Sequence, residues 1–113
     1  MHEASIAENI LEIAIDTALK NGAKKIVSIN LQIGKLSAID NSALVTAFDV
    51  IKEGTIANEA VLNIENIPII GKCNECGDES EYEELYFKCK RCGSFDMSLI
   101  SGEELSIKDI EVE

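Results

Sequence analysis

Histidine is the metal ligand that this sequence almost lacks, because only one of the 113 residues, His2, is a histidine. A hydrolytic zinc site takes three protein ligands, keeps one coordination position open for water and places a general base beside it. One histidine and four cysteines in two close pairs do not supply such a site. The sequence disfavours a metal hydrolase, and we expect a protein that is not an enzyme.

Positive charge is also scarce. The chain has 10 lysines and arginines against 21 aspartates and glutamates, which gives a formal net charge of −11. A surface of this sign repels nucleic-acid phosphates and anionic lipids. Lys88, Lys90 and Arg91 form a local cationic cluster, but six acidic residues between Glu75 and Glu84 oppose it. We expect neither nucleic acid nor a membrane as a partner.

Long apolar runs are absent as well, and the first residues are unlike a secretory leader. No stretch reaches the roughly 18 apolar residues that a membrane-spanning helix needs. The first residues include Glu3, Glu8 and Glu12, whereas a leader has a basic segment and an apolar core. We therefore expect a cytoplasmic protein. With 46% hydrophobic residues, the chain can bury one ordinary core, or a small core with a metal-stabilised appendage.

Two segments have the apolar periodicity of amphipathic helices. The first covers residues 3–21 and is followed by Gly22, which suits a left-handed helix end. The second is capped by one of residues 40–42 and can be closed by Gly54. The apolar positions that carry these patterns are Ala7, Ile10, Leu11, Ala14 and Ala18, and then Leu44, Ala47, Phe48 and Ile51.

Three segments alternate in the manner of strands. In KIVSINLQIG the apolar face is formed by Val27, Ile29, Leu31 and Ile33, with Ser28, Asn30 and Gln32 opposite. AVLNIENI alternates up to Pro68, and ELSIKDIEVE places Leu105, Ile107, Ile110 and Val112 on one face if a β-bulge lies at residues 108–109. We predict an α+β fold in which two helices flank a small three-stranded sheet. Its domain comprises residues 1–67 and 103–113, and residues 68–102 form an inserted zinc ribbon.

The four cysteines form two CxxCG motifs, CNECG at residues 73–77 and CKRCG at residues 89–93. Two residues between cysteines let both sulfurs face one side of a tight loop, and the glycine relieves the backbone where it turns. YEELYF can supply a strand between the motifs. We predict a structural zinc site with the ligands Cys73, Cys76, Cys89 and Cys92. Zinc binding of this kind contributes about 10–16 kcal/mol of apparent free energy.

Cysteine pairs of this kind have three other uses, as disulfides, as redox thiols and as iron ligands. Two disulfides are disfavoured in a cytoplasmic protein. A thiol-redox role is weak, because no clear helix follows either motif to lower a cysteine pKa. Iron bound as in rubredoxin remains open, since the same four thiolates accept it, and the colour of the protein would distinguish the two metals.

The first three residues, Met-His-Glu, form a second candidate metal site. In most proteins, a histidine at the second position is an ordinary residue of the chain terminus. Here the α-amino group of Met1 and the amide nitrogens of His2 and Glu3 can close five-membered chelate rings, with the His2 imidazole as a fourth ligand. Nitrogen donors of this kind suit square-planar nickel(II) or copper(II) better than tetrahedral zinc. The helix that follows leaves its first amides without intrahelical partners and holds the segment in place.

The combined motifs resemble the hydrogenase maturation nickel metallochaperone HypA/HybF family along essentially the whole chain. The resemblance rests on MHEASI at the start, INLQIGKLSAID, AFDVIKEGT, GKCNECG, FKCKRCGS and SGEELSIKDIEVE. It implies a nickel carrier that performs no catalysis, has an inserted structural zinc domain and works with a HypB-type GTPase. It also implies delivery of nickel to the large-subunit precursor of a nickel–iron hydrogenase. Carried over to this chain, His2 is the key nickel ligand and Met1 and Glu3 contribute backbone nitrogens.

Asp40 and the function of the chain each have two interpretations. Asp40 is more readily explained as a helix cap than as a nickel ligand, although an acid in that loop could supply an oxygen or orient His2. The alternative function is a zinc-ribbon adaptor that binds proteins without transferring nickel. We expect the chain to be a monomer or a weak homodimer.

Overall fold

The computed structural model describes residues 2–85 and 87–113. Contacts between residues divide the chain into two compact units. The helical unit contains the residues through Gln32, Ile39–Glu65 and Ser106–Glu113, and the cysteine unit contains Ile33–Ala38 and Asn66–Leu105. No helix in the described ranges is long and apolar enough to cross a membrane.

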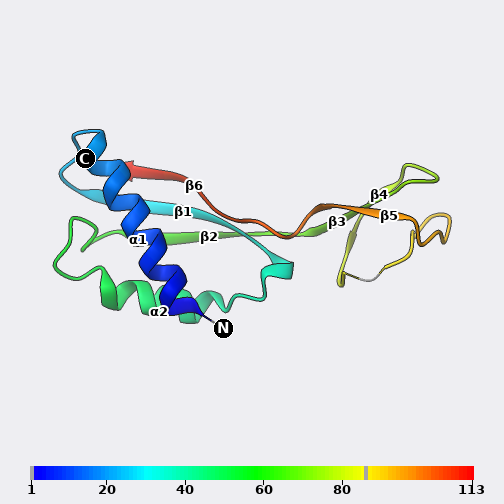
Figure 1. Cartoon of the computed structure of the whole chain (residues 1–113), viewed down its shortest axis with the longest axis horizontal. Coiled ribbons are helices and arrows are strands. Elements are labelled where there is room, and N and C mark those ends of the chain that lie inside the picture. The colour runs from blue at the N-terminus through cyan, green and yellow to red at the C-terminus, as the bar shows by residue number, and fades with distance from the viewer. Residues whose placement is uncertain (1, 86) are drawn as a thin grey trace. The chain divides into compact units, whose positions relative to one another are not determined.

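The helical unit combines two helices with one sheet (Figure 1). The helices are α1 (Glu3–Lys20) and α2 (Asn41–Ile51), which pack against each other. The sheet has the strand order β2-β1-β6, with β1 (Ile26–Gly34) at the centre, β2 (Val61–Ile67) on one side and β6 (Leu105–Val112) on the other. This arrangement confirms the predicted α+β class. The core residues with almost no exposed surface include Ala7, Ala14, Ile29, Leu31, Leu44 and Phe48.

The predicted alternation of β1 is correct only from Ile29 onward. Ile29, Leu31 and Ile33 are buried as expected, but Val27 is half-buried and Ser28 is buried. The backbone N–H of Ile26 donates to the carbonyl of Ile56 at 2.9 Å, so the segment after α2 lies against the start of this strand. Ile26 and Ser28 lie two residues apart and are both buried, so the face that the pattern assigned to solvent is covered at this end of the strand.

The prediction for β6 is also only partly correct. Ile107 and Ile110 are half-buried, and their three-residue spacing agrees with the expected change in alternation. Leu105 and Val112, which were expected on the same buried face, are exposed. β6 lies at the edge of its sheet, where neighbouring elements cover the strand ends less completely. The β-bulge at residues 108–109 stays a prediction.

The cysteine unit contains a second three-stranded sheet, with the order β4-β3-β5. β3 (Ile69–Cys73) pairs antiparallel with β4 (Glu79–Tyr82) and with β5 (Met97–Ser101). The strand predicted over YEELYF is misplaced, because β4 ends at Tyr82 and Tyr86 lies outside the described residues. The rings of Tyr82 and Phe87 stack with centroids 4.3 Å apart.

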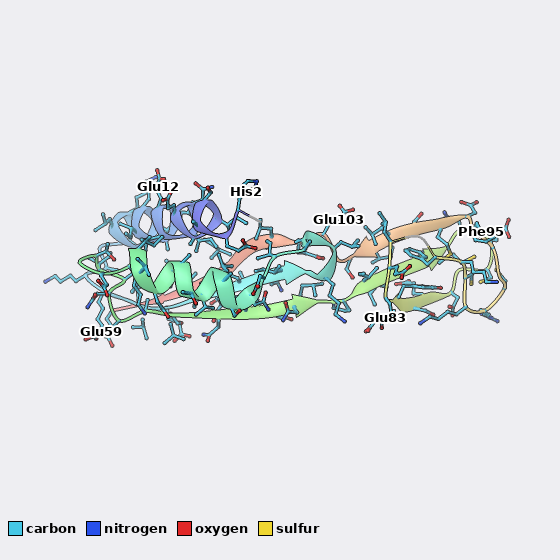
Figure 2. The ribbon with its side chains drawn as sticks, turned by 90° about the horizontal axis from the view of Figure 1, so that it is seen from below. His2, Glu12, Glu59, Glu83, Phe95 and Glu103 are labelled. Carbon is cyan, nitrogen blue, oxygen red and sulfur yellow. The ribbon has the colours of Figure 1, made fainter. Side chains whose placement is uncertain are left out.

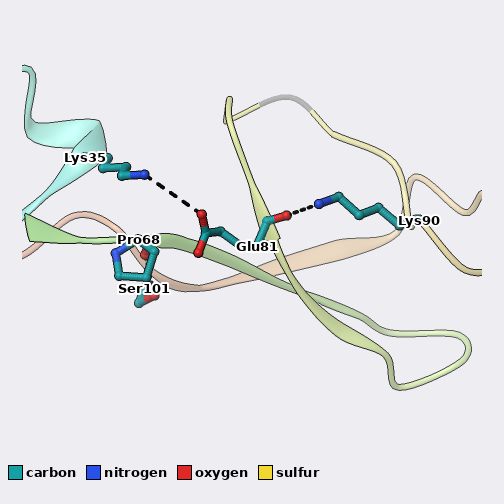
Figure 3. A network of polar contacts seen from close by, with 5 residues as sticks. All are labelled: Lys35, Pro68, Glu81, Lys90 and Ser101. Carbon is teal, nitrogen blue, oxygen red and sulfur yellow. Dashed lines mark hydrogen bonds and ion pairs between the residues drawn. The ribbon is translucent and has the colours of Figure 1, made fainter.

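The connection between β1 and α2 belongs to the cysteine unit. It contains a short 3-10 helix, Lys35–Ser37. Backbone N–H groups of Gly34 and Leu36 donate to the carbonyls of Glu104 and Gly102 at 2.7 and 2.8 Å. Figure 3 shows the Lys35 ammonium group directed at the Glu81 carboxylate, 3.9 Å away. The predicted ribbon limits, residues 68–102, did not include this segment, and the domain limits stay a prediction.

The backbones of Gly34 and Gly102 approach so closely that we predict a large effect of Gly34→Ala. A Cβ at Gly34 would lie 2.0 Å from the Gly102 carbonyl oxygen, so one of the two segments must move. Overpacking of this kind costs about 1–3 kcal/mol, and we expect the upper end of that range. The measurement is urea unfolding of the zinc-loaded protein.

Gly54→Ala is the matched control for this variant. Nothing lies within 4 Å of a Cβ at Gly54, so the substitution adds only the strain of a left-handed backbone, about 1–2 kcal/mol. Equal destabilisation of the two variants would show that the close approach of Gly34 and Gly102 is unimportant.

Candidate metal centre

The four cysteine sulfurs converge at one end of the cysteine unit. Their Sγ atoms all lie within 4.8 Å of one another, although the two CxxC motifs are far apart in the sequence. The Cys73–Cys92 and Cys76–Cys89 sulfur pairs are each separated by 3.5 Å. Cys73 and Cys89 are buried, whereas Cys76 and Cys92 are exposed. The structure therefore brings together all four residues that the sequence predicted as one site.

The two motifs fold into equivalent loops. The amide of Gly77 donates to the Cys73 carbonyl at 3.0 Å, and the amide of Gly93 donates to the Cys89 carbonyl at 2.9 Å. Both glycines have φ +80°, a left-handed conformation that other residues rarely adopt. Each loop thereby turns its two cysteines toward the same point.

The sulfur positions fit a tetrahedral metal ion. Four Zn–S bonds of about 2.3 Å require sulfur–sulfur separations of about 3.8 Å. The observed range, from 3.5 Å to less than 4.8 Å, brackets this value. Four thiolates leave no open coordination position, so a metal held here stabilises the fold and does not activate water. Iron would meet the same geometry, as expected from the sequence.

Backbone amides prepare the first cysteine of each motif for a metal. The amides of Cys92 and Arg91 both donate to Cys89 Sγ at 3.3 Å, and they lower the pKa of the Cys89 thiol to about 7. The amide of Cys76 donates to Cys73 Sγ at 3.3 Å and lowers the pKa of that thiol. Thiolate is the form that binds metal, so the loops favour it before an ion arrives.

Residues outside the motifs hold the second loop in place. The Lys90 amide donates to the Tyr82 hydroxyl at 3.1 Å, and the Lys90 ammonium group lies 4.7 Å from the centre of the Tyr82 ring. The same ammonium group donates to the Glu81 carbonyl (Figure 3). Sequence reasoning assigned Lys90 only to a cationic cluster. The overlooked signal is Tyr82, an aromatic residue at the end of β4 that lies seven positions before Cys89.

The first loop has a corresponding support. The Asn74 amide donates to the Asp96 carbonyl at 2.9 Å, and Asn74 Nδ2 donates to the Asp96 carboxylate at 3.0 Å. The Ser98 hydroxyl then donates to Asn74 Oδ1. These bonds connect the loop after β3 to the start of β5, and the sequence analysis did not identify them.

The second candidate site lies at the start of α1. His2 is the N-cap residue, and its carbonyl accepts the first helical hydrogen bond, from Ile6, at 3.1 Å. His2 is exposed and its side chain, labelled in Figure 2, makes no capping hydrogen bond among the described residues. Met1 lies outside the described residues, so its predicted role as a ligand stays a prediction.

Glu3 and Asp40, far apart in the sequence, meet beside this helix end. The Glu3 side chain is buried, and its carboxylate accepts a hydrogen bond from the Asp40 amide at 3.1 Å. The start of α1 is therefore held by the loop that begins α2. The structure brings the Asp40 backbone to the Glu3 carboxylate, and a role of either residue in binding nickel stays a prediction.

Asp40 caps α2, which is the role that the sequence favoured for it. One carboxylate oxygen, Oδ1, accepts hydrogen bonds from the Ser42 amide, the Ser42 hydroxyl and the Ala43 amide at 2.9–3.2 Å. The bonds from Ala43 and Ser42 lower the pKa of the Asp40 carboxyl group. Capping through one oxygen leaves the other compatible with a metal contact, so the ligand role stays a prediction.

The four clustered cysteines place the chain among small proteins with a site able to bind a metal. The model of a protein family described as hydrogenase/urease nickel incorporation metallochaperone, hypA, matches residues 1–112. The chain belongs to this HypA family.

Individual relatives agree along their full length. The hydrogenase maturation factor HypA of Trichormus variabilis is 46% identical over 113 residues, which cover 100% of this chain and 96% of the relative. That of Rhizobium leguminosarum bv. viciae is 38% identical over 112 residues, 99% of each chain. The solution structure of the nickel metallochaperone HypA from Helicobacter pylori is similar with a TM-score of 0.68 and 28% identity, covering 99% of this chain and 97% of that one.

We predict that Cys92→Ser releases the bound metal and unfolds the cysteine unit while the helices persist. The helical unit has its own buried core, whereas the cysteine unit depends on the four sulfurs. Metal analysis should find less than one tightly bound ion per chain, and far-UV circular dichroism should retain the helical signal. Arg91→Gln, which changes a neighbouring exposed residue, is the control and should retain the metal. One tightly held ion in Cys92→Ser would refute the four-thiolate site.

For the cap of α2 we predict that Asp40→Ala lowers the melting temperature, whereas Asp40→Asn, which keeps an oxygen acceptor, lowers it less. Because the pKa of Asp40 is lowered on folding, its stabilising effect is present above the ordinary carboxyl pKa and is lost as the pH falls through the folded value. The difference between wild type and Asp40→Ala should therefore shrink below about pH 4. A difference that does not change with pH would contradict the ionised cap.

Proposed function

We propose that this protein binds nickel(II) through the first residues of the chain and delivers it to the large-subunit precursor of a nickel–iron hydrogenase. The observation that carries the proposal is the family match, which begins at residue 1 and so includes the Met-His-Glu segment. Membership in a family of nickel-incorporation metallochaperones supports nickel as the transferred cargo. The acceptor and the site on this chain are our inference.

The proposed nickel ligands are the His2 imidazole and backbone nitrogens of Met1, His2 and Glu3. An exposed imidazole at the N-cap suits this role, because a carrier must pass its ion to another protein. The first amides of an α-helix lack intrahelical acceptors, so their use as ligands would not break helical hydrogen bonds. The contact between the Glu3 carboxylate and the Asp40 amide would limit the movement of the segment.

We propose zinc for the four cysteines and a structural role for it. The two metal sites then differ in chemistry. Sulfur donors in a closed tetrahedron retain zinc, whereas nitrogen donors at an exposed chain end favour nickel and permit its exchange. We further propose that a HypB-type GTPase assists the transfer and that this chain performs no catalysis itself.

The nickel site should depend strongly on pH and on the α-amino group. Amine and imidazole donors bind protons in the neutral range, and protons compete with the metal, so nickel affinity should fall steeply from mildly alkaline to mildly acidic pH. His2→Gln should abolish or markedly weaken binding. Adding Gly-Ser before Met1 should do the same, because it converts the amine into an amide. Calorimetric and absorbance titrations with nickel measure each effect.

Glu3→Gln is the matched control, because it removes charge but keeps both the backbone nitrogen and an oxygen that can accept from Asp40. Its nickel affinity should fall less than that of His2→Gln, and zinc content should stay unchanged in every variant. Unchanged nickel affinity in the extended protein would refute the terminal site. Wild-type protein that held zinc but bound no nickel would favour the alternative function, a zinc-ribbon adaptor that binds proteins without transferring nickel.

A further inference from the structure

An open apolar groove lies in the cysteine unit. It has a volume of about 860 Å³, and its lining residues are Leu85, Phe87, Lys88, Phe95, Met97 and Leu99. Met97 and Leu99 alternate along β5, so their side chains share one face of the strand. Phe95 lies in the turn before β5, where the Met97 amide donates to the Phe95 carbonyl at 3.0 Å. Leu85 and Phe87, from the segment after β4, complete the apolar lining.

Apolar side chains that line the groove are exposed, although side chains of this kind are usually buried. Phe95 is 80% exposed and Leu85 is 46% exposed (Figure 2 labels Phe95). Small-molecule sites bury most of their ligand in an enclosed cavity, and a groove whose lining side chains are this exposed does not enclose one. A protein segment that covers the groove from outside would bury these side chains. Exposed apolar patches of this kind often mark protein interaction sites.

β5 borders the groove, and its outer edge is compatible with a segment lying beside it. It is an edge strand, and it pairs only with β3 in the part of the chain that the structure describes. The sequence of β5, MSLIS, contains no charged residue and no proline, although many edge strands use these to prevent pairing. The pairing with β3 shifts between Ile70 and Gly71, so Ile100 is an extra residue and the regular part of the strand is Met97–Leu99.

The charges near the groove indicate the kind of partner. Glu83 and Glu84 immediately precede Leu85, and Asp96 lies between Phe95 and Met97; all three are exposed. One cation, Lys88, lines the groove itself. A segment with uncharged apolar side chains at its centre and basic residues on both sides complements this pattern. A second copy of this chain, with a net charge of −11, does not.

We propose that this groove docks a short segment of a partner protein that has apolar residues flanked by lysine or arginine. Apolar side chains of the segment occupy the space between Phe95, Met97 and Leu85, and its basic residues face the neighbouring carboxylates. The interaction does not involve nickel or the start of the chain. It is therefore tested with zinc-loaded protein in the absence of nickel, and its failure would leave the proposed function untouched.

Three synthetic heptapeptides test the proposal by calorimetry and by amide chemical shifts of the full chain. Lys-Lys-Leu-Thr-Phe-Lys-Lys should bind and shift amides of residues 87–99. Glu-Glu-Leu-Thr-Phe-Glu-Glu should bind at least tenfold more weakly because of charge, and Lys-Lys-Ser-Thr-Ser-Lys-Lys because it lacks apolar anchors. Phe95→Ser should weaken the first peptide about tenfold, which corresponds to about 1.4 kcal/mol.

The control variant is Val50→Ser, which removes an apolar side chain with similar exposure from α2. It should leave binding unchanged, and the zinc content of both variants should equal that of wild type because neither residue is buried. Equal affinity for the basic and acidic peptides, shifts confined to other residues, or no effect of Phe95→Ser would overturn the proposal. Self-association of the chain that Phe95→Ser abolishes would also overturn it, because the occupant would then be a second copy.

Discussion

The convergence of four sulfur atoms is the constraint on which the cysteine unit depends. Few of its side chains are buried, and the large ones are Ile33, Ile69 and Tyr82, in addition to Cys73 and Cys89. A core of this size does not offset the conformational entropy of the residues in Ile33–Ala38 and Asn66–Leu105. A metal ion that joined both loops would supply the missing free energy, because the ligands come together only when the chain folds. Hydrogen bonds of Tyr82, Lys90 and Asn74 hold the same loops in place.

The helical unit is organised differently. Its helices and central strand share a continuous apolar core, and a hydrogen bond from the Asp40 amide to the Glu3 carboxylate bears on the proposed nickel site. That bond joins the beginnings of the two helices. A rigid element therefore positions the backbone of residues 2 and 3 while the His2 side chain stays exposed. Firm support of a site and easy release of its cargo are compatible in this arrangement.

Sequence patterns predicted the features that repeat over many residues or have a fixed spacing. The helix of residues 3–20, the cap at Asp40 and the four-cysteine cluster belong to this group. They failed where coverage by distant segments decides exposure. Ser28 is buried together with Ile26 because both faces of β1 are covered at that end, and Leu105 and Val112 are exposed on the edge strand β6. The strand predicted over YEELYF was misplaced, since β4 ends at Tyr82.

The inclusion of residues 33–38 in the cysteine unit makes the two units unequal as modules. Excision of the ribbon, by joining β2 directly to β6, would remove the partners of Gly34, Leu36 and Lys35 as well. The same stretch of chain leads without interruption into Asp40. A deletion limited to the ribbon residues would therefore leave the connection before α2 without its hydrogen-bond partners. An isolated ribbon would lose only the contacts with residues 33–38. In evolutionary terms, the ribbon could not be gained or lost as an independent cassette without redesign of the β1–α2 connection.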